Sequence, residues 1–139
     1  MSILYTAKAS AVAGRNGRAF SDDSRLEVSL SMPKALGGDD GPGTNPEQLF
    51  AAGYSACFLS AMKLVASQSG LELSEQTQVS AEVGIGPRSE GGFGLVVALI
   101  ASVPGLSVEQ ANELLVKTEQ VCPYSNATRG NVKTTLKLA

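Results

Sequence analysis

Short stretches in which apolar and polar side chains alternate mark three parts of the chain as strands with one covered face. The alternation is clear in residues 26–30 and 132–138, and it is looser in residues 3–12. Residues 37–43 are rich in glycine and aspartate and are predicted to form a loop.

Two further strands are predicted at residues 76–85 and 93–103, joined by a turn that contains Gly91 and Gly92. Residues 95–101 are all apolar. A strand without alternation is typical of a sheet that is covered on both faces or that lies at an interface. We therefore expect this strand to have one of these two surroundings.

The most strongly marked element is a long helix. Asn45 is a favourable N-cap, Pro46 suits the first helical position, and Gln48 completes a predicted capping box. No strong stop signal occurs before Ser69 and Gly70. Apolar residues cover nearly every face of the first part of this helix: Leu49, Phe50, Ala51, Ala52, Tyr54, Ala56, Cys57, Phe58, Leu59, Ala61, Met62, Leu64 and Val65. We predict a helix that is buried on all sides.

A second helix is predicted to begin at the capping box that Ser107 and Gln110 form. It is expected to end at Cys122, because a residue before a proline avoids helical geometry. Its apolar stripe consists of Val108, Ala111, Leu114 and Leu115. Polar side chains occupy the opposite face, so this is predicted to be a surface helix.

The order of these elements describes a single α+β domain over residues 1–139, without internal repeats. A single sheet of about five strands cannot cover all sides of the long helix. We expect a second copy of the chain to complete the enclosure, in an obligate homodimer with the two long helices at its centre.

Composition excludes several classes of partner. Charged residues make up 17% of the chain and the net charge is −2, without a basic run, so we expect no nucleic acid partner. The first residues do not resemble a signal peptide, and no unbroken apolar run approaches the roughly 18 residues of a membrane span. We expect a cytoplasmic protein without a membrane partner.

The cysteine and histidine content indicates which chemistry is available to the chain. The chain has two cysteines, Cys57 and Cys122, and no histidine. In a reducing cytosol a cysteine pair is more often redox-active than a permanent structural disulfide. The usual metal ligand and the usual base beside a catalytic cysteine are both missing. We expect no metal and no cofactor, and an activator of another type.

Cys57 lies inside the long helix, where burial is expected to raise the pKa of its thiol above the ordinary value of about 8.5. The helix dipole fades beyond the first turn, so a cation has to lower this pKa. Arg15 and Arg18 are candidates, and the pattern alone does not choose between them. They flank Asn16-Gly17, which predicts a hairpin with a type I′ turn.

A buried arginine needs an anion beside it, and Glu47 at the start of the long helix is the best candidate. Glu47 and Cys57 are ten positions apart, about 15 Å along one helix axis. One guanidinium therefore does not easily reach both within one chain. Two long helices that cross antiparallel bring Glu47 toward the partner's Cys57. We expect the arginine and Glu47 to act in trans, on the cysteine of the partner chain.

Each of these residues also has a simpler interpretation. Cys57 is the kind of small apolar residue that fills a core. Arginines beside a turn are often solvated, and Glu47 suits the first turn of any helix. Two other functions remain open: a binding protein for small apolar ligands, which needs neither cysteine, and a structural protein held by a Cys57–Cys122 disulfide.

Four segments together resemble one known family. Residues 44–58 and 121–131 resemble the two cysteine motifs of the organic hydroperoxide resistance proteins, within the OsmC-like superfamily. Residues 14–18 and 91–95 are similar to further segments of that family. The resemblance implies an α+β fold in which an antiparallel sheet wraps a long buried central helix, with a second surface helix. It also implies an intertwined homodimer whose central helices are wrapped by two sheets.

The resemblance also implies a function. Members of this family are cysteine-based peroxidases that reduce alkyl and fatty-acid hydroperoxides to alcohols and protect against oxidative stress. By this resemblance Cys57 attacks the peroxide, and Cys122 resolves the resulting sulfenic acid as a Cys57–Cys122 disulfide. Arg15 activates Cys57, and Glu47 orients Arg15. A dithiol, the lipoyl group of a lipoylated protein, re-reduces the disulfide.

The residues around the cysteine suggest which peroxides it reduces. Apolar surroundings are expected to favour organic hydroperoxides over hydrogen peroxide, because an alkyl chain gains more from leaving water. The candidates for these surroundings are Phe50, Phe58 and Phe93.

Overall fold

The chain forms two three-stranded sheets, so the expectation of a single sheet of about five strands is wrong. The computed structural model describes all residues from 1 to 139, in two units, residues 1–49 and 50–139. Between the two sheets, residues 30–77 contain an isolated bridge from Leu30 to Thr44, a 3-10 turn and the long helix, but no strand. The α+β class and the long helix are confirmed.

The first unit contains an antiparallel meander of β1 (Ala9–Val12), β2 (Arg18–Ser21) and β3 (Glu27–Ser29). The strand predicted at residues 26–30 is confirmed, and residues 37–43 form the predicted loop after a 3-10 turn at Lys34–Leu36. The strand predicted at residues 3–12 is too long. Strand β1 pairs only from Ala9 onward, opposite the last residue of β2, so the earlier residues have no strand beside them.

The predicted hairpin between β1 and β2 is present, but its turn is not type I′. The paired strand ends leave a loop of five residues with a 3-10 turn at Gly14–Asn16. Positive φ occurs at Ala13 (59°) and Gly14 (60°), whereas Gly17 has φ −115°. A Cβ on Gly17 would lie 1.7 Å from the carbonyl oxygen of Val12, so the turn admits only glycine there.

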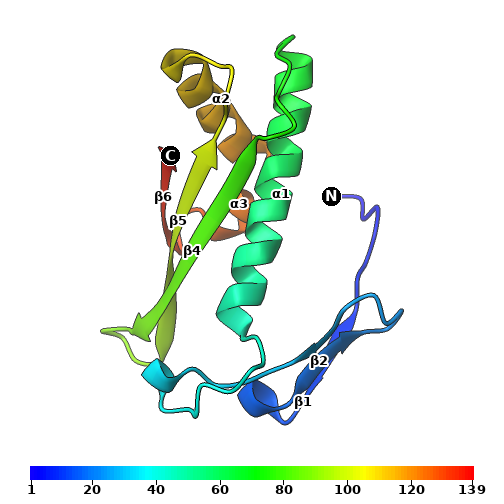
Figure 1. The fold of residues 1–139 in the computed structure, drawn as a ribbon, viewed down its shortest axis with the longest axis vertical. Coiled ribbons are helices and arrows are strands. Elements are labelled where there is room, and N and C mark those ends of the chain that lie inside the picture. The colour runs from blue at the N-terminus through cyan, green and yellow to red at the C-terminus, as the bar shows by residue number, and fades with distance from the viewer. The chain divides into compact units, whose positions relative to one another are not determined.

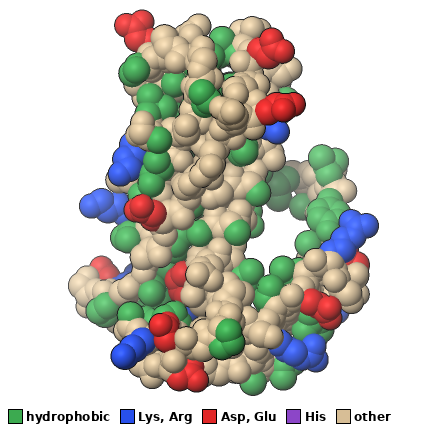
Figure 2. All heavy atoms as spheres, viewed as in Figure 1, with side chains coloured by type: hydrophobic (Ala, Val, Ile, Leu, Met, Phe, Trp, Pro, Cys, Tyr) green, Lys and Arg blue, Asp and Glu red, His purple; other side chains and the backbone are tan.

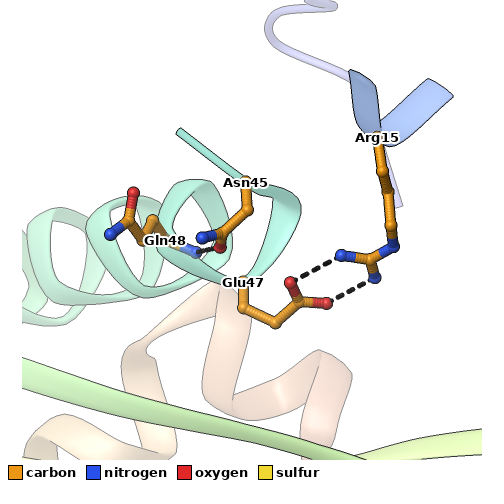
Figure 3. A network of polar contacts seen from close by, with 4 residues as sticks. All are labelled: Arg15, Asn45, Glu47 and Gln48. Carbon is orange, nitrogen blue, oxygen red and sulfur yellow. Dashed lines mark hydrogen bonds and ion pairs between the residues drawn. The ribbon is translucent and has the colours of Figure 1, made fainter. Parts of the chain in front are cut away.

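Helix α1 (Pro46–Gln68) begins and ends as predicted. The Asn45 side chain accepts a hydrogen bond from the backbone N–H of Gln48 at 2.9 Å (Figure 3). The predicted capping box is incomplete, because the Gln48 side chain accepts from the Thr44 hydroxyl instead (2.6 Å). At the other end Gly70 has φ 69°, and two backward hydrogen bonds close the helix in a Schellman motif.

The second unit contains the sheet of β4 (Gln78–Pro87), β5 (Phe93–Ser102) and β6 (Lys133–Leu138), in that order. Strands β4 and β5 are antiparallel, whereas β5 and β6 are parallel. The expectation of an antiparallel sheet is therefore wrong for its last strand. Two helices lie between β5 and β6, and such a crossover brings the chain back in the same direction.

These helices are α2 (Val108–Val121) and α3 (Pro123–Thr128). The capping box of α2 is confirmed, with both hydrogen bonds between Ser107 and Gln110. Val108 does not belong to the buried stripe, since it is 68% exposed. Cys122 ends α2 as predicted, but the sequence analysis missed α3, which starts immediately with Pro123. Proline blocks a continuing helix and equally suits the first position of a new one.

The core of the second unit lies between α1, α2 and the inner face of the sheet formed by β4, β5 and β6 (Figure 1). It consists of Tyr54, Phe58, Ala61, Met62, Val65, Ala66, Val79, Val97, Leu99, Ala101, Val103, Ala111, Leu114, Leu115 and Cys122. Strand β5 is buried on one face only within the chain, because Val97 and Leu99 are covered while Val96 is 53% exposed. Within one copy this strand is therefore covered on one face only, and its place at an interface stays a prediction.

Helix α1 is likewise buried on one side only, so burial on all sides is not met within the single chain. Ala52, Ala56 and Ser60 repeat every four residues along an exposed stripe. Leu64 on this helix is 50% exposed. Figure 2 shows hydrophobic side chains at the surface between charged ones. By length and hydropathy α1 also meets the requirements for a membrane span, which the core helices of many soluble proteins meet as well.

Candidate functional site

Arg15 and Glu47 form a bidentate ion pair within the first unit. The two guanidinium nitrogens donate to the two carboxylate oxygens at 2.6 and 2.8 Å (Figure 3). Arg15 comes from the turn after β1, and Glu47 from the first turn of α1. Their side chains are 29% and 14% exposed, so the pair is largely shielded from solvent.

The pair shifts the ionisation of both partners in the direction that keeps them charged. The hydrogen bonds from Arg15 hold the pKa of Glu47 below its ordinary value, against the opposing effect of burial. The same bonds raise the pKa of Arg15 further. Glu47 is therefore a carboxylate at neutral pH, and Arg15 is a fixed cation in a defined orientation.

The geometry also distinguishes the two arginines of the turn. Arg15 reaches Glu47, whereas the guanidinium of Arg18 lies over the ring of Phe20, 4.5 Å from its centroid. Arg18 is thus engaged in a cation–π contact. The sequence pattern left this choice open, and the family resemblance pointed to Arg15.

Cys57 and Cys122 meet within the second unit. Their Sγ atoms are 3.8 Å apart, and both cysteines are free. Cys57 lies on α1 and is partly exposed, whereas Cys122 is completely buried between α2 and α3. The more accessible thiol is the one that the sequence analysis predicted to attack.

Burial raises the pKa of the Cys57 thiol, in agreement with the prediction from its place in the helix. The backbone N–H of Tyr124 opposes this by hydrogen bonding, while the proximity of Cys122 adds to the rise. Tyr124 is the second residue of α3. Sequence alone gave no sign of this donor, because α3 was not predicted.

A buried hydroxyl cluster lies beside the cysteines and was also missed. The Tyr54 hydroxyl is 2.9 Å from that of Ser125 and 3.1 Å from that of Thr128. The rings of Phe50, Tyr54 and Tyr124 pack against one another. Sequence position alone gives no sign of this cluster, since its members are separated by about seventy residues.

The three phenylalanines suggested as apolar surroundings occupy different settings. Phe50 lies in the aromatic group, Phe58 is completely buried in the core, and Phe93 is 73% exposed at the start of β5. No three His, Cys, Asp or Glu side chains gather as a metal ligand set.

The structure therefore brings the four predicted site residues together as two pairs. Arg15 meets Glu47 in the first unit, and Cys57 meets Cys122 in the second. The placement of one pair beside the other stays a prediction.

Comparison with known proteins assigns the chain to a family. The family model of OsmC-like proteins matches residues 37–137. The organic hydroperoxide resistance protein of Xanthomonas axonopodis pv. citri is 56% identical over 137 residues, 99% of this chain and 96% of that protein. The chain belongs to the organic hydroperoxide resistance family of OsmC-like proteins. Both cysteine motifs, residues 44–58 and 121–131, lie inside the region that the family model matches.

Solved structures of organic hydroperoxide resistance proteins have the same fold. The one from Elizabethkingia anophelis is 50% identical, with a TM-score of 0.94 over 100% of this chain and 99% of that chain. OhrB of Bacillus subtilis is 42% identical, with a TM-score of 0.89 over 99% of this chain and 100% of that chain. The fold of this family therefore extends over both units of the chain.

Proposed function

We propose that this protein is a thiol peroxidase that reduces organic hydroperoxides, with Cys57 as the attacking thiol and Cys122 as the resolving thiol. The observation that carries the proposal is the pair of free sulfurs 3.8 Å apart, in a chain 56% identical to an organic hydroperoxide resistance protein. Two thiols in contact are suited to forming and breaking a disulfide in each catalytic cycle.

In the first step the Cys57 thiolate attacks the distal oxygen of the hydroperoxide. An S–O bond forms, the O–O bond breaks, and the leaving alkoxide takes a proton to become an alcohol. Cys57 is oxidised to a sulfenic acid and the peroxide is reduced. The partial exposure of Cys57 supports its role as the thiol that meets the substrate.

In the second step the sulfur of Cys122 attacks that of Cys57, and water leaves as the disulfide forms. The sulfurs have to approach from 3.8 Å to about 2.05 Å, a movement within reach of side-chain rotation. A dithiol then attacks the disulfide, releases both thiols through a mixed disulfide, and is itself oxidised. We propose a lipoyl group on a partner protein as this dithiol.

The raised pKa of Cys57 means that the thiol needs a cation to ionise at neutral pH. We propose that Arg15, oriented by Glu47, supplies it and also stabilises the departing alkoxide. The bidentate pair supports this role, because its geometry holds the guanidinium in one orientation.

We further propose that the site is completed in a homodimer, with Arg15 and Glu47 acting on the partner's Cys57. The exposed stripe of Ala52, Ala56 and Ser60 on α1 supports this arrangement, because small residues let two helices approach closely. The substrates in this proposal are alkyl and fatty-acid hydroperoxides, and the protein protects the cytoplasm against oxidative stress.

The test is the consumption of tert-butyl hydroperoxide with dihydrolipoamide as reductant, in wild type, Cys57→Ser and Cys122→Ser. We expect no reduction beyond background in Cys57→Ser, because the attacking sulfur is absent. Cys122→Ser is expected to complete the first turnover and then to stop, because its sulfenic acid is not resolved.

Two results would contradict the proposal. A Cys57→Ser protein that still protects cells against hydroperoxides would point to a binding protein for small apolar ligands. Hydrogen peroxide reduced as efficiently as the organic hydroperoxide would contradict the proposed substrate class.

A further inference from the structure

Helix α1 meets the segment that contains Cys122 and α3 through the rings of Phe50 and Tyr54, which pack on Tyr124, and through two polar contacts. In the first, the sulfurs of Cys57 and Cys122 lie 3.8 Å apart. In the second, the Tyr54 hydroxyl lies 2.9 Å from the Ser125 hydroxyl. Tyr54 precedes Cys57 by three residues and Ser125 follows Cys122 by three. The hydroxyl contact therefore lies about one helical turn from the thiol contact on both sides.

The hydroxyl contact is buried, and a third hydroxyl, that of Thr128, takes part in it. Tyr54 is 1% exposed, Ser125 3% and Thr128 6%. The Thr128 hydroxyl lies 3.1 Å from that of Tyr54 and 3.3 Å from the carbonyl oxygen of Ser125. An unpaired hydroxyl in such a place is costly, so this network strongly favours one position of α3 against α1.

The thiol contact provides no comparable constraint, because thiols are weak hydrogen-bond donors and acceptors. Helix α3 has only six residues, and so short a helix is not stable without tertiary contacts. The position of Cys122 at its start therefore depends on what fixes α3.

We propose that Tyr54 is a positioning residue, whose hydroxyl holds Ser125 and Thr128 so that Cys122 stays within reach of Cys57. This inference rests on the proposed function, since the step it serves is the attack of Cys122 on the Cys57 sulfenic acid. In that step the S–S bond forms, the S–O bond breaks, and hydroxide leaves with a proton as water.

The consequence concerns a competition for the sulfenic acid. A sulfenic acid that is not resolved reacts with a second hydroperoxide and becomes a sulfinic acid, which dithiols do not reduce. Loss of the Tyr54 hydroxyl slows resolution and increases this inactivation. The first attack by Cys57 forms no bond to Cys122, so its rate is expected to change much less than the rate of disulfide formation.

The experiment compares wild type with Tyr54→Phe, which keeps the ring and removes only the hydroxyl. Stopped-flow mixing with tert-butyl hydroperoxide measures sulfenic acid formation and then disulfide formation, and mass spectrometry measures sulfinic acid. We expect the first rate to stay within about twofold and disulfide formation to slow about five- to tenfold. The sulfinic acid fraction rises with hydroperoxide concentration. Ser125→Ala is a second variant with the same expected pattern.

Thr118→Val is the matched control. Thr118 is completely buried, and its hydroxyl donates to the Leu114 carbonyl within α2 at 2.7 Å, so the variant loses a buried hydroxyl that does not bond α3. Disulfide formation at the wild-type rate in both Tyr54→Phe and Ser125→Ala overturns the proposal. So does an equal slowing in Thr118→Val.

A parallel measurement separates this inference from the proposed function. The Cys57 thiolate attacks oxidised glutathione, forming a mixed disulfide and releasing one reduced glutathione; Cys122 then attacks the Cys57 sulfur, closing the intramolecular disulfide and releasing the second, without any peroxide. Slower closure in Tyr54→Phe supports the positioning role, and unchanged closure contradicts it. Failure of the wild type to consume hydroperoxide would instead contradict the proposed function.

Discussion

The ion pair of Arg15 and Glu47 and the thiol pair of Cys57 and Cys122 are held together in different ways. In the first, two formal charges attract each other through two short hydrogen bonds, and both pKa values shift toward the charged forms. In the second, two sulfurs touch at 3.8 Å, and burial raises the pKa of the Cys57 thiol and so favours its uncharged form.

The two pairs also differ in what fixes the relative position of their side chains. The ion pair is directional by itself, because a planar guanidinium matches a carboxylate. The thiol pair obtains its geometry from neighbours, namely the core around Phe58 and the hydroxyls of Tyr54 and Ser125. Substitutions in the ion pair are therefore expected to change the charge available to the site. Substitutions around the thiols are expected to change the distance between the Cys57 and Cys122 sulfurs.

Among substitutions of the ion pair, the largest effect is expected from Arg15→Met, which removes the cation and keeps much of the side-chain volume. If Arg15 activates Cys57, hydroperoxide reduction falls about hundredfold, in the range for loss of one charge-stabilising group. The pKa of Cys57 rises further, because no cation favours the thiolate. Steady-state assays measure the first effect, and the pH dependence of iodoacetamide alkylation measures the second.

Arg18→Met is the control for this experiment, since Arg18 lies over Phe20 and does not pair with Glu47. It is expected to change the rate by about twofold at most, as for a surface substitution. Equal losses in the two variants would show that the turn matters as a whole rather than Arg15 in particular.

A next test asks which chain supplies the cation. Arg15→Met and Cys57→Ser are each expected to be nearly inactive alone. If Arg15 acts on the partner's Cys57, a mixed dimer of the two variants contains one complete site. Random mixing yields half mixed dimers with one of two sites working, so about one quarter of wild-type activity returns. A site built within one chain returns none. Co-refolding of the two variants followed by the peroxidase assay decides between these outcomes.

The smallest effect is expected on stability, from Glu47→Gln. The pKa of Glu47 is lowered in the folded chain from an ordinary value of 4.5, so the pair contributes fully above about pH 4.5 and loses its contribution as pH falls through the folded pKa. At pH 7 the variant is expected to be about 1–2 kcal/mol less stable. Urea unfolding between pH 3 and pH 7 measures the difference.

The wild type and the variant are expected to converge in stability at the acidic end of this range. A difference that stays constant with pH would mean that Glu47 contributes by packing rather than by charge. Parallel curves for Arg15→Met and Glu47→Gln would in turn show that the two residues act as one pair.

Much of the fold was predictable because its signals are local. The cap at Asn45, the stop at Gly70 and the capping box at Ser107 depend on neighbouring residues, and all three ends lie where predicted. Helix α3 was missed because Pro123 ends one helix and begins another, two roles that look alike in the sequence.

The candidate site was predictable only in its composition. The absence of histidine directed attention to an arginine beside Cys57, but the choice of Arg15 needed the family resemblance, and the structure then paired Arg15 with Glu47. The Tyr124 N–H and the Tyr54 hydroxyl had no signal, because their roles arise from contacts between distant segments.

By itself the sequence determined the order of most strands and of the two longer helices, the ends of those helices and the residue types available for chemistry, since each depends on short-range preferences. Only the tertiary structure decided that the strands divide into two sheets, that the last strand runs parallel to β5, and that Cys57 touches Cys122. Those outcomes depend on long-range packing, in which a residue's partner is set by the path of the whole chain.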